Sequence, residues 1–204
     1  MIKINQKSGF ALVEILVVAG LLVVFTGALA VFSRDLFVFN ERYNLSFSAD
    51  SNAKSALKRL TAELRAAETS AMGGFPIESA ATNSIIFFSD PDKDGVRERL
   101  RYYIENGSLV RSITEPKGNP ASYFNEDEKS QDLIVGLLTA SSSFLYFGNN
   151  YDGSASSSPL LSPINSQDIK MARFVFVIQA SNAKAPTAYV VQSEVMIRNL
   201  KDNW

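Results

Sequence analysis

The feature that most constrains this chain is a run of nineteen residues without a charge near its N-terminus, from 15 to 33. As an α-helix with a rise of 1.5 Å per residue, this run would be about 28 Å long, close to the thickness of a membrane's hydrocarbon core. Glu14 stands directly before the run. A carboxylate near the hydrocarbon costs on the order of 2.5 kcal/mol or more, so its presence calls for a physical explanation.

The composition excludes several kinds of active site. The 204 residues include neither histidine nor cysteine, which removes disulfides, thiolate chemistry, the usual zinc sites and Ser-His-Asp triads. The 20 basic and 21 acidic residues give a net charge of −1, and no basic run indicates a nucleic-acid partner. The glycines form no phosphate-binding loop, and the carboxylates show no recognisable catalytic spacing. We therefore expect a protein that is not an enzyme.

The N-terminal apolar segment has two ordinary interpretations. A secretory signal peptide would combine a basic start, containing Lys3 and Lys7, with the apolar run and an A-x-A cleavage site at 28–30. A plain N-terminal membrane anchor would explain the same apolar run. Neither interpretation gives Glu14 a reason to be there.

A third interpretation starts from the sequence GFALVE at 9–14. It resembles the type III signal of type IV prepilins and of type II secretion pseudopilins, in which a basic leader ends in Gly, followed by Phe and, at the fifth mature position, Glu. The resemblance implies that prepilin peptidase cuts between Gly9 and Phe10 and methylates the new amine of Phe10. Glu14 would then serve assembly: an axially displaced neighbour would bring its Phe10 amine to this carboxylate, and the two buried charges would compensate each other.

The basic residues of the leader predict the orientation of the chain. Lys3, Lys7 and the initial amine precede the apolar run, and positive charge favours the cytoplasmic side of a membrane. We expect a single-pass protein of the cytoplasmic (inner) membrane, with a cytoplasmic leader at 1–9 and a transmembrane and assembly helix at 10–33. The C-terminal domain would be external and incorporated into a pilus or pseudopilus.

Beyond the apolar run, a helical pattern continues to about residue 72. One stripe of apolar residues recurs at intervals of three and four: Ala53, Leu57, Leu60, Leu64, Ala67 and Ala71. A similar stripe precedes it: Leu36, Phe39, Tyr43 and Phe47. Charged residues of the segment, including Glu63, fall largely on the other side. The Gly-Gly pair at 73–74 and Pro76 form a stop signal, so we expect an amphipathic helix at 34–72 that continues the membrane half.

After residue 74 the pattern changes to that of β-strands. Apolar or alternating runs predict strands at 83–90, 97–105, 108–114, 142–148, 169–181 and 188–200. The Asn-Gly pair at 106–107 is a strong hairpin signal. The polar segment 115–131 and the serine-rich segment 151–163 indicate surface loops. We therefore expect an α+β fold in which the long N-terminal helix packs on an antiparallel β-sheet domain formed by 73–204.

The strand region carries a second resemblance. The sequences FFSDPDKDGVRERLRYYIENGSLVRS (87–112), YFGNNYDGS (146–154) and SEVMIRN (193–199) are similar to PilW-type minor pilins and J-type minor pseudopilins. This implies a low-copy subunit that primes or caps a type IV pilus-like or type II secretion filament. Its partners would be prepilin peptidase, other pilin or pseudopilin subunits, and membrane lipid before assembly. The alternative function is a membrane-tethered surface adhesin or binding module whose globular domain binds an external ligand.

The loop DPDKDG at 90–95 is a candidate calcium site. Asp90, Asp92 and Asp94 alternate ahead of Gly95 as in the first half of an EF-hand loop, and Glu98 stands at the ninth position. Arg101, however, occupies the twelfth position, where an EF-hand has a bidentate Glu. The other interpretation is an acidic hairpin turn between two strands, in which Asp-Gly is favoured for its backbone conformation. Apart from Ca²⁺ at this loop, we expect no cofactor.

The prepilin interpretation predicts a mature chain that begins with an N-methylated Phe10. Removal of nine leader residues from 204 would leave 195. Intact-mass spectrometry of protein extracted from membranes detects both the cleavage and the methyl group. A mature chain that begins at Val31 would instead establish the signal-peptide interpretation.

Overall fold

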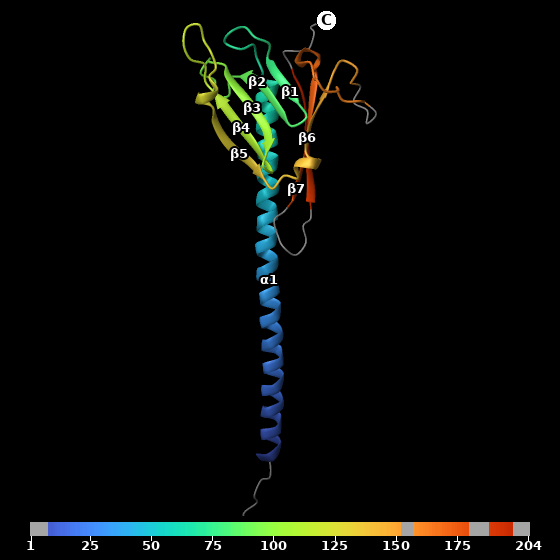
Figure 1. Cartoon of the computed structure of the whole chain (residues 1–204). Helices are drawn as coiled ribbons and strands as arrows, with labels where there is room; N and C mark the ends of the chain where they lie inside the picture. The colour runs from blue at the N-terminus through green and yellow to red at the C-terminus, as the bar shows by residue number, and fades with distance from the viewer. Residues whose placement is uncertain (1–7, 152–156, 180–187, 198–204) are drawn as a thin grey trace, which may run out of the picture. The chain divides into compact units, whose positions relative to one another are not determined.

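The computed structural model describes residues 8–151, 157–179 and 188–197; within 8–49 of its helix, it describes only the side chains of 12–37. The chain forms two compact units, Met1–Ser46 and Phe47–Trp204. One helix followed by antiparallel strands makes up the fold, which confirms the predicted α+β class (Figure 1).

The helix α1 runs from Ser8 to Arg65 and contributes to both units. Within it, Leu12–Phe37 is long and apolar enough to cross a membrane, judged by length and composition. The predicted end of the helix near residue 72 is wrong. The chain leaves the helix after Arg65 because its backbone turns to the sheet, where the Glu68 N–H donates to the Phe88 carbonyl at 2.9 Å.

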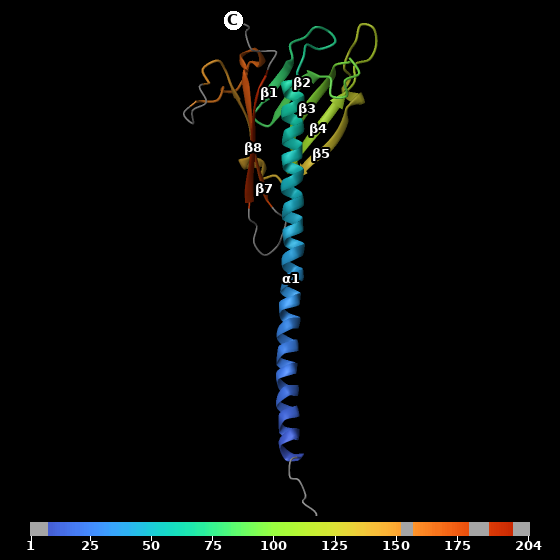
Figure 2. The same cartoon turned by 180° about the vertical axis from the view of Figure 1, so that it is seen from behind.

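The strands of the second unit form two antiparallel sheets. The order of the first is β1-β2-β3-β4-β5: β1 (Ile77–Ala81), β2 (Ser84–Ser89), β3 (Glu98–Glu105), β4 (Ser108–Thr114) and β5 (Lys129–Val135). The order of the second is β6-β7-β8: β6 (Ser143–Phe147), β7 (Met171–Gln179) and β8 (Ala188–Met196). Among the described residues, three short 3₁₀ helices lie between strands: η1 (Asn125–Asp127), η2 (Thr139–Ser141) and η3 (Ser166–Asp168). Figure 2 shows the C-terminal part of α1 in front of the strands of the first sheet.

All six predicted strands are present, and most of their ends differ from the prediction by a few residues. The predicted ends at 180–181 and 198–200 lie outside the described residues. The Asn-Gly turn between β3 and β4 is confirmed: Asn106 and Gly107 both have positive φ, 50° and 74°, as a two-residue hairpin turn requires. Two strands, β1 and β5, were not predicted, and the predicted loop 115–131 is wrong at its end because β5 begins at Lys129. Both strands lie at the edges of the first sheet. An edge strand needs no apolar alternation, since backbone hydrogen bonds to one neighbour hold it.

The predicted stripe of α1 packs in the core of the second unit. Its members are at most 3% exposed as far as Ala67: Ala53, Leu57, Leu60, Leu64 and Ala67. Ala71, which lies beyond the end of the helix, is exposed. The same core contains apolar side chains from both sheets, among them Phe87 of β2 and Phe174 of β7. The apolar stripe of the helix therefore shares one core with apolar side chains of both sheets.

Glu63 does not lie on a solvated side of the helix, as the charge pattern predicted. It is 8% exposed and lies against the first sheet. The Tyr102 hydroxyl donates to its carboxylate at 2.6 Å, and the Arg111 guanidinium donates to both carboxylate oxygens at 3.1 and 3.0 Å. Tyr102 and Arg111 are paired directly across β3 and β4. Burial beside Glu63 raises the pKa of the Tyr102 hydroxyl, which stays protonated and donates.

Breaking this buried ion pair should strongly destabilise the globular unit. Glu63→Met leaves the Arg111 charge without its partner, and we expect the free energy of unfolding to fall by about 3–5 kcal/mol. The triple variant Glu63→Met, Tyr102→Phe, Arg111→Met should recover most of that loss, because no polar group is left buried and unpaired. Denaturant titration of the chain in detergent, followed by circular dichroism, measures both values.

The control for this experiment is Asp50→Asn, which breaks the more exposed Asp50–Lys54 pair on the same helix. It should cost less than about 1 kcal/mol. A Glu63→Met loss no larger than that of the control would contradict a structural role for the buried pair.

Candidate functional site

The predicted cleavage and assembly residues lie in the first two turns of α1. The helix begins at Ser8, so Gly9 and Phe10 are in its first turn, and Glu14 follows one turn after Phe10. Positions four residues apart share a helix face, which places Phe10 and Glu14 on one side. The Glu14 side chain is exposed. The side chain of Phe10, and residues 1–7 of the predicted leader, lie outside the part that the structure describes.

Around Glu14 the surface of α1 is apolar and uncovered within the described part of the first unit. Every large apolar side chain from 12 to 37 is between 46% and 75% exposed. Leu36, which we predicted as the start of the upstream stripe, is among them at 51%. The rest of that predicted stripe, Phe39, Tyr43 and Phe47, lies outside the described side chains. A continuous apolar surface of this kind normally faces lipid or other proteins.

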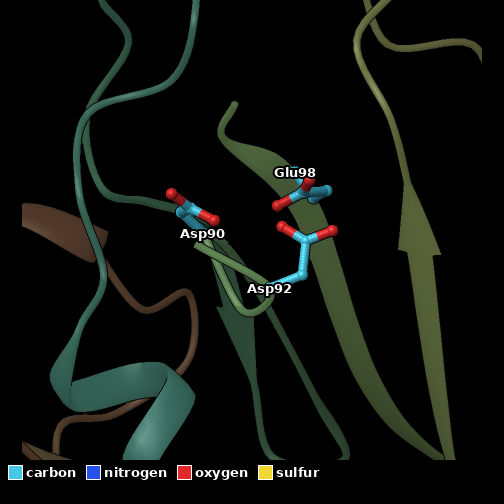
Figure 3. A group of neighbouring side chains, drawn as sticks. All are labelled: Asp90, Asp92 and Glu98. Carbon is cyan, nitrogen blue, oxygen red and sulfur yellow. The ribbon is translucent and has the colours of Figure 1, made fainter. Parts of the chain in front are cut away.

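The acidic loop between β2 and β3 brings three of the four predicted ligand residues together. One carboxylate oxygen each of Asp90, Asp92 and Glu98 lies within 4.8 Å of the others. Figure 3 shows the three carboxylates turned toward one another, Asp90 and Asp92 from the loop and Glu98 from β3. Asp94 does not belong to this group. Its carboxylate instead accepts a hydrogen bond from the Val96 N–H at 2.7 Å.

The backbone of the loop is arranged by hydrogen bonds to Asp90. Its two carboxylate oxygens accept from the Asp94 N–H at 3.2 Å and the Gly95 N–H at 2.9 Å. Burial opposes its charge, but these donors outweigh that effect and lower the pKa of Asp90. Gly95 has a φ of 89°, the left-handed conformation that glycine adopts at little cost, which is the backbone reason for the Asp-Gly pair. The predicted acidic turn between the two strands is therefore present, and it contains Asp90 and Asp92 of the cluster.

Glu98 is the unusual member of the cluster because it is buried. It is 3% exposed, and its Oε2 atom has no hydrogen-bond partner among the described residues. Burial raises the pKa of the Glu98 carboxyl from 4.5 to about 7, and the charges of the neighbouring aspartates contribute to the increase. Oxygen donors of this kind are those preferred by hard divalent cations such as Ca²⁺.

Sequence reasoning missed Ser89, which lies directly opposite Glu98 across β2 and β3. Its Oγ is buried and also has no hydrogen-bond partner among the described residues. No motif marks it; only the strand register relates it to the acidic loop. The buried group of Glu63, Tyr102 and Arg111 was missed for the same reason.

No protein-family model matches this chain, and the search of curated proteins found no match.

Replacing Glu98 with glutamine should stabilise the cation-free protein at high pH but not at low pH. Its folded pKa of about 7 is above the ordinary 4.5, so the charged form destabilises the folded chain as pH rises through this interval. In EDTA, Glu98→Gln should raise the free energy of unfolding on the order of 1–3 kcal/mol at pH 8, with no gain near pH 4. Denaturant titrations of the chain in detergent at both pH values provide the measurement.

Glu105→Gln is the matched control, because Glu105 ends the same strand and is exposed. It should leave the free energy of unfolding nearly unchanged at either pH. An equal gain for Glu98→Gln at pH 4 and pH 8 would show that the glutamine acts through packing rather than through charge.

Proposed function

We propose that this chain is a minor pilin or pseudopilin, a structural subunit that primes or caps a type IV pilus-like or type II secretion filament. In this proposal prepilin peptidase cuts after Gly9 and methylates Phe10. The chain then stays in the cytoplasmic membrane, surrounded by lipid, until it joins other pilin or pseudopilin subunits. Its role is structural, and it needs neither an enzymatic site nor a nucleic-acid partner.

The observation that carries the proposal is one carboxylate, Glu14, on an uncovered apolar helix. The segment Leu12–Phe37 has the length and composition of a membrane span, and its large apolar side chains are exposed throughout. Such a helix is compatible with lipid and equally with the helices of other subunits. A plain anchor would have no use for the Glu14 charge.

Assembly gives that charge a partner. Cleavage after Gly9 would create a cationic amine on Phe10, one helical turn before Glu14. In a filament of parallel, axially displaced helices, the amine of one subunit can lie beside Glu14 of the next. An ion pair in an apolar environment is strongly destabilised when one partner is removed, by roughly 3–5 kcal/mol, so the pair favours one axial register.

The alternative, a membrane-tethered adhesin or binding module, accounts for the apolar helix and for a folded domain. It gives neither the GFALVE sequence at 9–14 nor Glu14 a function. We therefore propose that the chain is a filament subunit. A normal incorporation of Glu14→Val into filaments would favour the adhesin instead.

Substitution of Glu14 separates the two functions. Glu14→Val should leave cleavage and membrane level unchanged or higher, because the helix becomes more apolar. Its incorporation into filaments should fall by about tenfold or more, because the neighbour's amine loses its counter-charge. Glu14→Asp should be intermediate, since it keeps the charge but shortens the reach. Immunoblots of the membrane and filament fractions, from cells that express the partner subunits, measure both quantities.

The matched control is Thr26→Val, which also makes the apolar segment more apolar but removes no charge. It should be incorporated normally. Normal incorporation of Glu14→Val would contradict the register role and favour the anchor of an adhesin. A subunit at the filament tip has no neighbour above it, so its Glu14 would have no amine to pair with. If the subunit is shown to lie at the tip, a dispensable Glu14 would revise its place in the filament and not its role as a filament subunit.

A further inference from the structure

The acidic cluster of the β2–β3 loop has features that a filament subunit does not require. We propose that Asp90, Asp92 and Glu98 form a binding site for one Ca²⁺ ion, which stabilises the folded globular unit. The inference does not rest on the proposed function, because it concerns only groups within the second unit.

The spacing of the carboxylates fits one calcium ion. The three ligand oxygens lie within 4.8 Å of one another. Calcium–oxygen distances are about 2.3–2.6 Å, so oxygens on opposite sides of one Ca²⁺ are about 4.6–5.2 Å apart. The three carboxylates are therefore close enough to one another to share one ion. Ca²⁺ takes six to eight oxygens, and water or backbone carbonyls can fill the remaining positions.

The charge of the cluster has no counter-charge within the part of the chain that the structure describes. None of the three carboxylates forms an ion pair there. The two arginines that flank Glu98 are directed to other partners: Arg97 pairs with Glu68, and Arg99 donates to Glu78 at 2.6 and 2.9 Å. A divalent cation would supply the positive charge that neighbouring side chains do not.

A second observation is the buried Oε2 atom of Glu98, which has no hydrogen-bond partner among the described residues. At 3% exposure its Oε2 lies away from water, accepts no hydrogen bond from the described residues, and the group faces the two aspartates (Figure 3). A buried polar atom without a partner costs free energy and therefore needs an explanation. Ser89 Oγ, on the same face because the two residues are directly paired, is likewise without a partner there. A bound ion with its waters would satisfy both groups.

The donor set favours Ca²⁺ over other metals. The chain has no histidine or cysteine, so the softer ligands that zinc and copper prefer are absent. Mg²⁺ requires shorter distances of about 2.0–2.1 Å in a regular octahedron, which three carboxylates spread over a loop and a strand match less well. Calcium accepts the irregular geometry that this cluster offers.

The site would connect two parts of the globular unit. Arg97, next to Glu98, accepts a hydrogen bond on its backbone carbonyl from the Tyr123 hydroxyl at 2.6 Å. That hydroxyl in turn accepts from the Ala71 N–H at 3.1 Å, in the segment that follows α1. An ion held by the loop and by Glu98 would fix the start of β3 and, through Tyr123, the chain that leaves the helix. We therefore expect binding to stabilise the folded unit.

The test uses the full chain in detergent at pH 7.5, treated with EDTA and then titrated with CaCl₂. The midpoint of thermal unfolding should rise by about 5 °C or more at a hundredfold excess over the dissociation constant. Asp92→Asn and Glu98→Gln should abolish the rise, since each removes one ligand charge. Asp94→Asn is the matched control: it makes the same charge change in the same loop but lies outside the cluster, and its rise should equal that of the unmodified chain.

Equilibrium dialysis with radioactive Ca²⁺ gives a second readout, with one ion bound per chain expected and less than one-tenth of that for Asp92→Asn at the same free Ca²⁺. The proposal is overturned by the absence of any Ca²⁺-dependent rise in the unmodified chain, or by an equal rise in all four proteins. An equal rise with MgCl₂ would overturn the assignment to calcium.

Discussion

The globular unit depends on one apolar stripe along the last turns of α1. Ala53 and Ala56 are buried in the core, and Leu57, Leu60 and Leu64 share that core with apolar side chains of both sheets. A sheet of three or five strands has an apolar face that must be buried against another element. Because both sheets contribute to the same core as this stripe, the helix covers the two at once, and neither needs a second layer of its own.

Periodicity along the chain predicted the apolar stripe of the helix and most of the strands, but neither the end of the helix nor the strands β1 and β5. The helix stripe and the β3–β4 hairpin depend on residues a few positions apart, and such local patterns are visible in a sequence. The edge strands β1 and β5 were missed because their pairing is decided by the neighbouring strand and not by their own alternation. The prediction that Glu63 is solvated was wrong for a related reason. Periodicity identifies the sides of the helix, but it does not show which residues of the sheet contact each side. Arg111, the partner of Glu63, is 48 residues away in the sequence.

The acidic cluster was also predictable in part from the sequence. The spacing of Asp90, Asp92 and Glu98 gave the correct members of the cluster, whereas Asp94 bonds to its own loop backbone. The EF-hand spacing did not show that Glu98 is buried. The signal for its burial is the alternation of β3, which places Glu98 on the core face in line with Leu100. Nor could the spacing identify Ser89, which only the β2–β3 register places opposite Glu98.

Three glutamates of this chain differ in whether the described residues supply a counter-charge. Glu63 is buried, and its charge is compensated within the fold by Arg111 and Tyr102. Glu98 is equally buried but has no cationic partner in the described part of the second unit. Glu14 lies on a helix whose apolar surroundings, in the proposed function, are lipid or other subunits. A carboxylate in an apolar place is costly unless its charge is paired. For Glu98 and Glu14 the described residues provide no such pairing, and the partners that we propose are a Ca²⁺ ion for Glu98 and the Phe10 amine of a neighbouring subunit for Glu14.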